Sequence, residues 1–189
     1  MSTELPVSIK DADFMFENSP VKVIANRNSP EIELAGLKIG PLKEGVEYEI
    51  RFWAAQELAK AGVVHFREGD ILDALKLNKI HYKERVQSVK QISPLPDDFY
   101  PRIRRFIKDL KKKANSTPEK MVEYNKMARL SRDIVNCRLK KIISLASAPA
   151  QTDQFLKSLT MEERILYSHL YEIITEWRSD ILKGDGGDD

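Results

Sequence analysis

The chain has 189 residues, of which 42% are hydrophobic and 32% are charged, and its formal net charge is +2. This balance excludes a histone-like protein held on nucleic acid by net charge, and it argues against a wholly disordered chain. The single cysteine, Cys137, excludes an intrachain disulfide and a cysteine-rich metal site. No apolar run reaches the ~18 residues of a membrane span, and the N-terminus lacks a signal-peptide pattern, so we expect a soluble, cytoplasmic protein.

Residues 1–92 indicate a small β-rich domain. Residues 46–52 alternate apolar and polar side chains, as in a strand with one face in a core. Residues 52–61 change to a helical period, and Gly62 follows as a helix stop. Residues 63–66 predict a strand that completes a small sheet around this helix.

The stretch from Asp70 to Gln91 predicts a short helix and a connector. Asp70 can cap a helix whose inward side chains are Ile71, Leu72 and Leu75. Residues 76–91 are polar enough to link two domains.

Two prolines mark the domain boundary. Pro94 and Pro96 bias their neighbours towards extended backbone, which places the boundary between residues 92 and 93. Residues 93–183 then predict an all-α domain, and residues 184–189 an acidic, disordered tail. The expected fold class is α+β: a small N-terminal mainly-β domain followed by an all-α helical bundle domain.

Capping residues locate two long helices in the second domain. Thr117 caps, and Pro118 begins, a helix that meets no stop before Pro149. Thr160 and Glu163 form a capping box that starts the last helix. An apolar stripe follows on that helix, formed by Leu166, Leu170, Ile173, Trp177 and Ile181, with Tyr167, Tyr171 and Ile174 beside it.

The apolar positions of both long helices spread over more than one face. A helix that is apolar over several faces is buried on more than one side, which favours a second subunit over a self-sufficient bundle. The alternative is a compact bundle that covers all these positions by itself. The predicted partner-binding residues are Trp53, Leu95, Phe99, Tyr100, Tyr124, Met127, Val135, Arg138, Tyr167, Tyr171 and Trp177.

Charge is unevenly distributed along the helical half. Residues 102–141 contain fourteen Lys or Arg and four Asp or Glu, a net charge of +10, whereas residues 142–189 have a net charge of −5. One interpretation is a surface that follows nucleic-acid phosphates. The favoured interpretation is a solvated or intersubunit face, because aromatic side chains are not interleaved with the basic ones. The residues expected to contact nucleic acid or an acidic partner are Arg104, Arg105, Lys111, Lys112 and Lys113.

The sequence contains no recognisable catalytic or cofactor-binding constellation. Phosphate-loop, nucleophile-elbow and zinc-protease motifs are absent. The three histidines, His65, His81 and His169, are far apart in the sequence, so a zinc site is not expected. We therefore expect no cofactor, no metal and no enzymatic activity.

Four stretches, in this order and spacing, resemble a subunit of the GINS family of replication proteins. Residues 39–46 resemble the Gly-Pro turn of the family's small β domain, and residues 53–58 its Trp-Ala helix. Residues 94–100 are similar to the opening of its helical domain. Residues 138–142 and 159–167 are similar to the end of its long helix and the start of its last one.

The resemblance covers residues 20–183 and leaves residues 1–20 unmatched. Because the sheet domain precedes the helical domain, the chain resembles the archaeal paralogue related to the second and third eukaryotic subunits. The resemblance implies a non-catalytic scaffold that assembles with a paralogous GINS subunit into a hetero- or homo-tetramer. It further implies contacts with the MCM helicase, a RecJ-like protein and primase, stimulation of unwinding, and a place beside the nucleoid at replication forks.

Overall fold

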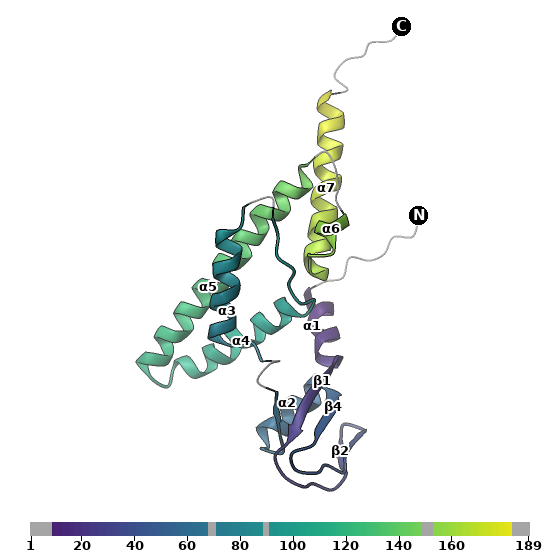
Figure 1. The fold of residues 1–189 in the computed structure, drawn as a ribbon, viewed down its shortest axis with the longest axis vertical. Coiled ribbons are helices and arrows are strands. Elements are labelled where there is room, and N and C mark those ends of the chain that lie inside the picture. The colour runs from purple at the N-terminus through teal and green to yellow at the C-terminus, as the bar shows by residue number, and fades with distance from the viewer. Residues whose placement is uncertain (1–8, 68–70, 89–90, 149–152, 183–189) are drawn as a thin grey trace. The chain divides into compact units, whose positions relative to one another are not determined.

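The computed structural model describes residues 9–67, 71–88, 91–148 and 153–182. They form two compact units, one of Ser8–Leu72 and one that begins at Asp73. The first unit contains all the described strands and the second is helical, which confirms the predicted α+β class (Figure 1). The tail predicted at 184–189 lies outside the described residues.

The first unit is a three-stranded antiparallel sheet with a helix on it and a separate hairpin. The strand order is β4-β1-β5, and β2 pairs with β3. The elements of this unit are α1 (Ile9–Asn18), β1 (Pro20–Ala25), β2 (Ile32–Leu34), β3 (Leu37–Ile39), β4 (Glu47–Arg51), α2 (Phe52–Lys60) and β5 (Val64–Phe66).

The core of the first unit lies between its sheet and α2. In β4, the half-buried Tyr48 and Ile50 pack on this core while Glu47 and Glu49 are exposed, which confirms the predicted alternation at these positions. Val46, predicted on the core face, precedes the strand and is exposed. The predicted helix and the closing strand correspond to α2 and β5. Helix α1 lies within residues 1–20, which the family resemblance did not cover. It brings the ring of Phe16 to 4.5 Å from that of Phe52, measured between ring centroids.

The second unit is a set of helices arranged around one long helix. Helices α3, α4 and α7 each pack on α5. None of the described helices combines the length and hydropathy that a membrane span requires. The elements are α3 (Ala74–Val86), α4 (Phe99–Ala114), α5 (Pro118–Ala146), α6 (Asp153–Leu156) and α7 (Met161–Leu182).

Helix α3 belongs to the helical unit, so the boundary between the two units lies earlier in the chain than the sequence predicted. The sequence placed this boundary between residues 92 and 93, but the compact units meet at Leu72 and Asp73. The residues expected to be a polar connector form most of α3, because Leu77 and Glu84 are buried where α3 packs on α5.

The start of α3 also differs from the prediction. Asp73 caps α3, and its carboxylate accepts a hydrogen bond from the backbone N–H of Lys76 at 2.8 Å. Two of the three side chains expected to point inward, Ile71 and Leu75, are exposed. Asp70, the predicted cap, lies outside the described residues.

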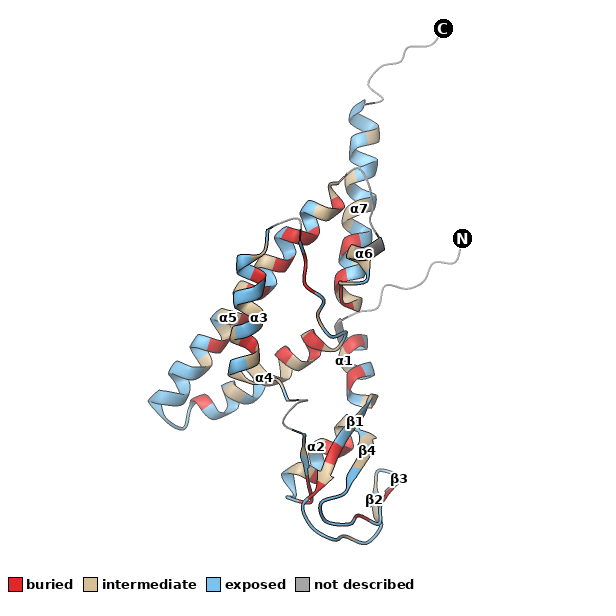
Figure 2. Ribbon diagram, viewed as in Figure 1, coloured by how far each residue is buried: buried red, intermediate tan, exposed pale blue. Residues whose placement is uncertain are grey.

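The core of the second unit runs along one side of α5 (Figure 2). One cluster joins Ile142 and Ala146 of α5 to Leu159 and to Tyr167 of α7. Figure 2 shows the C-terminal end of α7 mostly in the pale blue of exposed residues. Most side chains in the second half of this helix are therefore exposed in the described part of the chain.

Candidate functional site

Arg138 of α5 is fully buried and lies where several segments of the helical unit meet. Its guanidinium donates two hydrogen bonds to the carboxylate of Glu163, from Nε to Oε1 at 2.6 Å and from Nη2 to Oε2 at 2.6 Å. Its Nη1 donates to Oε1 of Glu84 at 3.0 Å. The planar fork of arginine suits this bidentate geometry. Arg138 thus connects α5 to both α3 and α7.

The remaining donors of this site also have partners. Nη1 of Arg138 donates to the carbonyl oxygen of Ser93 at 2.7 Å, and Nη2 to that of Ser158 at 3.3 Å. Lys141, one turn further along α5, donates from Nζ to Oε2 of Glu84 at 2.7 Å. We call Glu84, Arg138, Lys141 and Glu163 the buried charge network, in which two cations balance two carboxylates.

Glu163 also closes the capping box at the start of α7. Its Oε2 accepts from the backbone N–H of Thr160 at 3.0 Å, and its own N–H donates to Oγ1 of Thr160 at 3.3 Å. The predicted box is therefore confirmed. The hydroxyl of Tyr100, in α4, donates to Oε1 of Glu163 at 2.6 Å. The carboxylate of Glu163 thus caps the start of α7, accepts a hydrogen bond from α4 and forms an ion pair with α5.

Burial and the neighbouring charges decide the protonation of this site. Burial, and then the charge and hydrogen bond of Glu163, raise the pKa of Tyr100 well above its ordinary value. Burial lowers the pKa of Arg138, but the hydrogen bonds and charge of Glu163 outweigh it, and the pKa is raised overall. The phenol and the guanidinium both keep their protons at neutral pH. This arrangement can therefore fix the helices in place.

Two apolar stripes lie on the surface of the helical unit. The α7 stripe consists of Leu166, Ile173, Trp177 and Ile181, and the last three are 62%, 62% and 60% exposed. The neighbouring face of α7, which carries Tyr167, Tyr171 and Ile174, packs on the core cluster of α5.

The second stripe runs along α5. It consists of Met121, Val135, Leu139 and Ile143, whose spacing places them on one face of the helix. All four are exposed, although none reaches the exposure of Trp177. Exposed apolar side chains at successive turns of one helix face, as at Val135, Leu139 and Ile143, are typical of interaction sites.

Four of the predicted partner-binding residues are buried within the chain itself. Phe99, Met127, Arg138 and Tyr167 face the inside of the helical unit, so their prediction as partner contacts is corrected for this chain. The reason for Arg138 is its pairing with two carboxylates, and for the other three it is core packing on the faces turned towards neighbouring helices.

The other predicted partner-binding residues are distributed over both units. Trp177 and Val135 are exposed and lie on the α7 and α5 stripes. Trp53 packs on the core of the first unit. Four more of these predicted residues, all in the helical unit, are half-buried: Leu95, Tyr100, Tyr124 and Tyr171.

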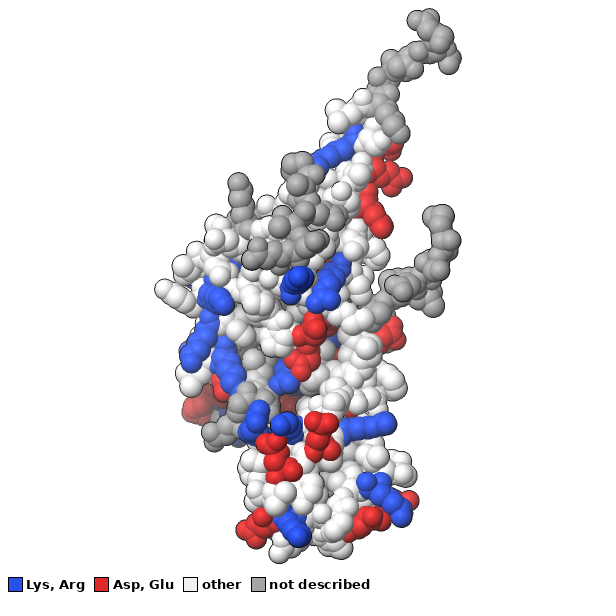
Figure 3. All heavy atoms as spheres, turned by 45° about the vertical axis from the view of Figure 1, so that its right-hand side comes forward, with Lys and Arg blue, Asp and Glu red and all other residues white. Residues whose placement is uncertain are grey.

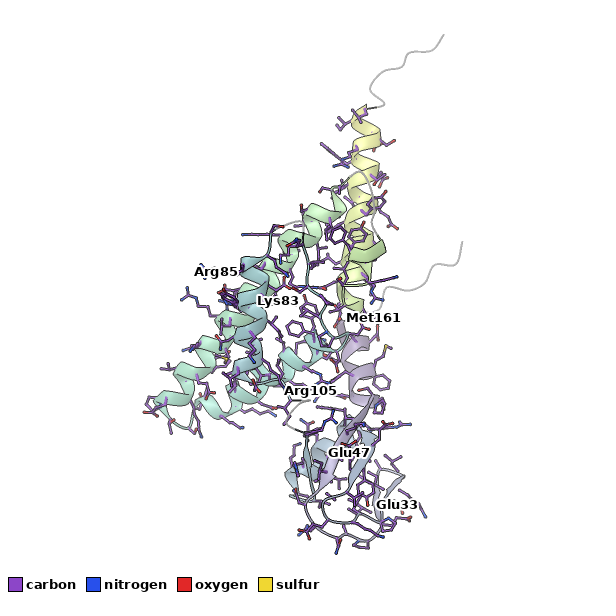
Figure 4. All side chains as sticks on the ribbon, in the orientation of Figure 1. Glu33, Glu47, Lys83, Arg85, Arg105 and Met161 are labelled. Atoms are coloured by element: carbon purple, nitrogen blue, oxygen red, sulfur yellow. The ribbon has the colours of Figure 1, made fainter. Side chains whose placement is uncertain are left out.

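The basic residues of segment 102–141 fall into two groups, those buried or half-buried in the helical unit and those exposed on its surface. Arg104 is half-buried and lies 3.5 Å from Glu162, measured from Nη2 to Oε1, and Arg138 and Lys141 are buried. The side chains of Lys111, Lys112 and Lys113 are exposed at the end of α4. Arg105, labelled in Figure 4, is half-buried on the same helix.

Sequence reasoning missed several residues of these sites. Glu84 carried no signal, because its partners lie far away in the sequence. Leu139 and Ile143 could have been found, since they fall four and eight residues after Val135, the helical repeat of one face. In the described residues no cluster of three or more His, Cys, Asp or Glu side chains is placed to hold a metal ion.

Comparisons with known proteins agree with this organisation. The family model of the GINS complex protein helical bundle domain matches residues 71–182, and that of the PSF2 N-terminal domain matches residues 8–65. A human protein, DNA replication complex GINS protein PSF2, is 23% identical over 156 residues, which cover 81% of this chain and 80% of the human one. With matches over both units in this order, the chain belongs to the GINS family of DNA replication proteins, as a subunit related to PSF2.

Proposed function

We propose that this chain is a non-catalytic scaffold subunit of an archaeal GINS complex, built into it through the α5 and α7 stripes. The α7 stripe carries the proposal, because it places Ile173, Trp177 and Ile181 in water along about two turns of one helix. Exposing such side chains costs free energy that burial against a partner would recover. The partner is a paralogous GINS subunit, in a hetero- or homo-tetramer.

The structure of α7 supports a partner on its outer side. Near its C-terminal end, α7 contacts the end of α5 through a hydrogen bond from Nη2 of Arg178 to the carbonyl oxygen of Ser147 at 2.7 Å. Glu172, Glu176 and Asp180 lie on the same half of the helix, and Figure 3 shows acidic atoms near that end of the chain. An apolar stripe with charged residues beside it is the usual anatomy of a protein interface, in which the charges set register.

The test is co-expression of the full chain with a paralogous GINS subunit from the same genome. We expect the two proteins to co-purify as a stable oligomer. The variant Ile173→Glu should lose the paralogue, since it places a charge in the stripe. The control Thr175→Glu adds the same charge to an exposed position on the opposite side of α7 and should retain it.

Native mass spectrometry and light scattering measure the outcome. A monodisperse monomer at micromolar concentration that captures no paralogue would refute the proposal. Equal loss of the paralogue by both variants would refute the role of the stripe while leaving assembly itself intact.

The same proposal extends to the replication fork. The assembled subunit would link the MCM helicase to a RecJ-like protein, with primase as a further partner, in the cytoplasm beside the nucleoid. Family membership supports this role. The assay is strand displacement by MCM with and without the purified assembly: we expect faster unwinding with it, and an unchanged rate would contradict the link.

A further inference from the structure

The last two turns of α4 carry an unusual density of positive charge. Lys108, Lys111, Lys112 and Lys113 are all exposed, and we call them the lysine cluster. The one acidic residue among positions 108–113 is Asp109. Its Oδ1 lies 3.8 Å from Nζ of Lys112, with side chains 51% and 69% exposed, so solvent screens this pair.

Helix stability does not account for the cluster. A cation in the last turn interacts favourably with the negative end of the helix dipole, and one or two lysines would supply this effect. Lys108 and Lys112 are four residues apart on the helix, an arrangement in which like charges destabilise it. The cluster therefore has an electrostatic cost that the helix itself does not require.

Three lysines of the cluster lie on the outer side of α4, and Lys113 lies closer to its buried side. Phe99, Ile103 and Ala114 are buried on the side that faces the helical unit. The helical repeat places Lys108, Lys111 and Lys112 together on the side turned away from these residues. Lys108 to Lys112 is four residues, or about 6 Å of helix at 1.5 Å per residue. Duplex DNA presents a phosphate every ~1.7 Å along its axis when both strands are counted, so this length faces three or four phosphates.

We propose that the lysine cluster binds the sugar-phosphate backbone of nucleic acid. The composition of this side favours nucleic acid over an acidic protein. Stable protein interfaces need a desolvated apolar centre, and the exposed residues at 108–113 are lysines and an aspartate. Phosphate contacts need only positioned cations. Since no exposed aromatic side chain lies among them for stacking, the binding is independent of base sequence.

The proposal goes beyond assembly of the GINS complex and is tested on the full chain alone. Fluorescence anisotropy measures its affinity for labelled single-stranded and duplex DNA of mixed sequence at about 50 and about 200 mM salt. Three lysine–phosphate contacts predict that this fourfold rise in salt weakens duplex binding by about 40-fold, from a slope of about −0.9 per contact.

The test variant is K108Q/K111Q/K112Q, which removes the three lysines of the outer side. It should weaken binding at about 50 mM salt by at least tenfold and reduce the salt slope for duplex DNA by about 2–3. The matched control is K79Q/K83Q/R85Q, which removes three exposed cations from α3, two of them labelled in Figure 4. It should change the affinity less than threefold, and circular dichroism should show that both variants are folded.

Two results would overturn the proposal. One is the absence of DNA binding by the wild-type chain at about 50 mM salt, which would leave an acidic protein as the partner of the cluster. The other is equal weakening by the two triple variants, which would mean that DNA responds to overall charge and not to this site. Comparing the affinities for single-stranded and duplex DNA shows which form of DNA the cluster prefers.

Discussion

Replacing Arg138 by methionine tests whether the buried charge network holds the helical unit together. Arg138 makes five hydrogen bonds, three of them to carboxylate oxygens. Methionine fills a similar space with a flexible apolar side chain and supplies none of them. After the substitution Glu84 keeps its ion pair with Lys141, whereas Glu163 is left as a buried carboxylate without a cation.

The expected loss follows from this count. Breaking a buried ion pair by removing one partner costs about 3–5 kcal/mol, because the remaining charge stays desolvated. Whole domains are stable by about 5–15 kcal/mol, so Arg138→Met should remove a large part of the stability of the helical unit. The matched control is Arg129→Met on the same helix, which is exposed and should cost about 0.5 kcal/mol or less.

Urea unfolding of the full chain, followed by far-UV circular dichroism, measures both variants. A second variant, R138M/E163Q, removes both charges and keeps a glutamine that can still serve the capping box. We expect it to regain at least half of the lost stability. The reasoning fails if Arg138→Met costs less than about 1 kcal/mol, well below the range for a broken buried pair, or if the double variant is no more stable than the single one.

Two further predictions concern other parts of the chain. Because the pKa of Tyr100 is raised in the folded state, its contribution to stability is complete below pH of about 10, where the unfolded tyrosine titrates, and is lost as the pH rises further. Tyr100→Phe should therefore flatten the alkaline decline of stability measured by urea unfolding at several pH values, and an unchanged slope would contradict this. Gly40 has a φ of +105°, and an added Cβ would meet the backbone N of Leu42 at 3.1 Å, whereas Gly36 at φ +79° has open space around it. Gly40→Ala should cost the first unit about 1–3 kcal/mol by hydrogen exchange, more than Gly36→Ala, and equal costs would show that the close contact is unimportant.

Local signals predicted local structure well. The Thr160–Glu163 box, the Thr117 cap with Pro118 after it, and the alternating strand β4 all depend on neighbours within a few residues. The α+β class follows from the same periodicities. The residues that form each of these features lie within a few positions of one another in the sequence. They can therefore be recognised without knowledge of the tertiary fold.

The buried charge network could not be predicted in this way. Glu84 and Glu163 lie 54 and 25 residues from Arg138, and a charged side chain on a helix is ordinarily solvated. Only the packing of α3 and α7 on α5 shows that Arg138 faces inward. For the same reason Arg138 was predicted to contact a partner protein, and its partners are instead carboxylates of its own chain.

The sequence likewise did not determine which face of α7 packs on the rest of the chain. Both sides of this helix carry apolar residues, so periodicity alone could not say which side packs on α5. The structure places Tyr167 and Ile174 against the core and leaves Ile173 and Trp177 outside.

The wide sequence span of the Arg138 contacts has a consequence for how the protein is made. During synthesis α5 leaves the ribosome before Glu163, so Arg138 has only the earlier Glu84 as a carboxylate partner until the start of α7 emerges. Contacts that close long loops form slowly, because the chain entropy is lost before the contact energy is gained. The helical half should therefore reach its native packing only after translation has passed α7, whereas the strand-rich unit ahead of it can fold while the rest is still being made.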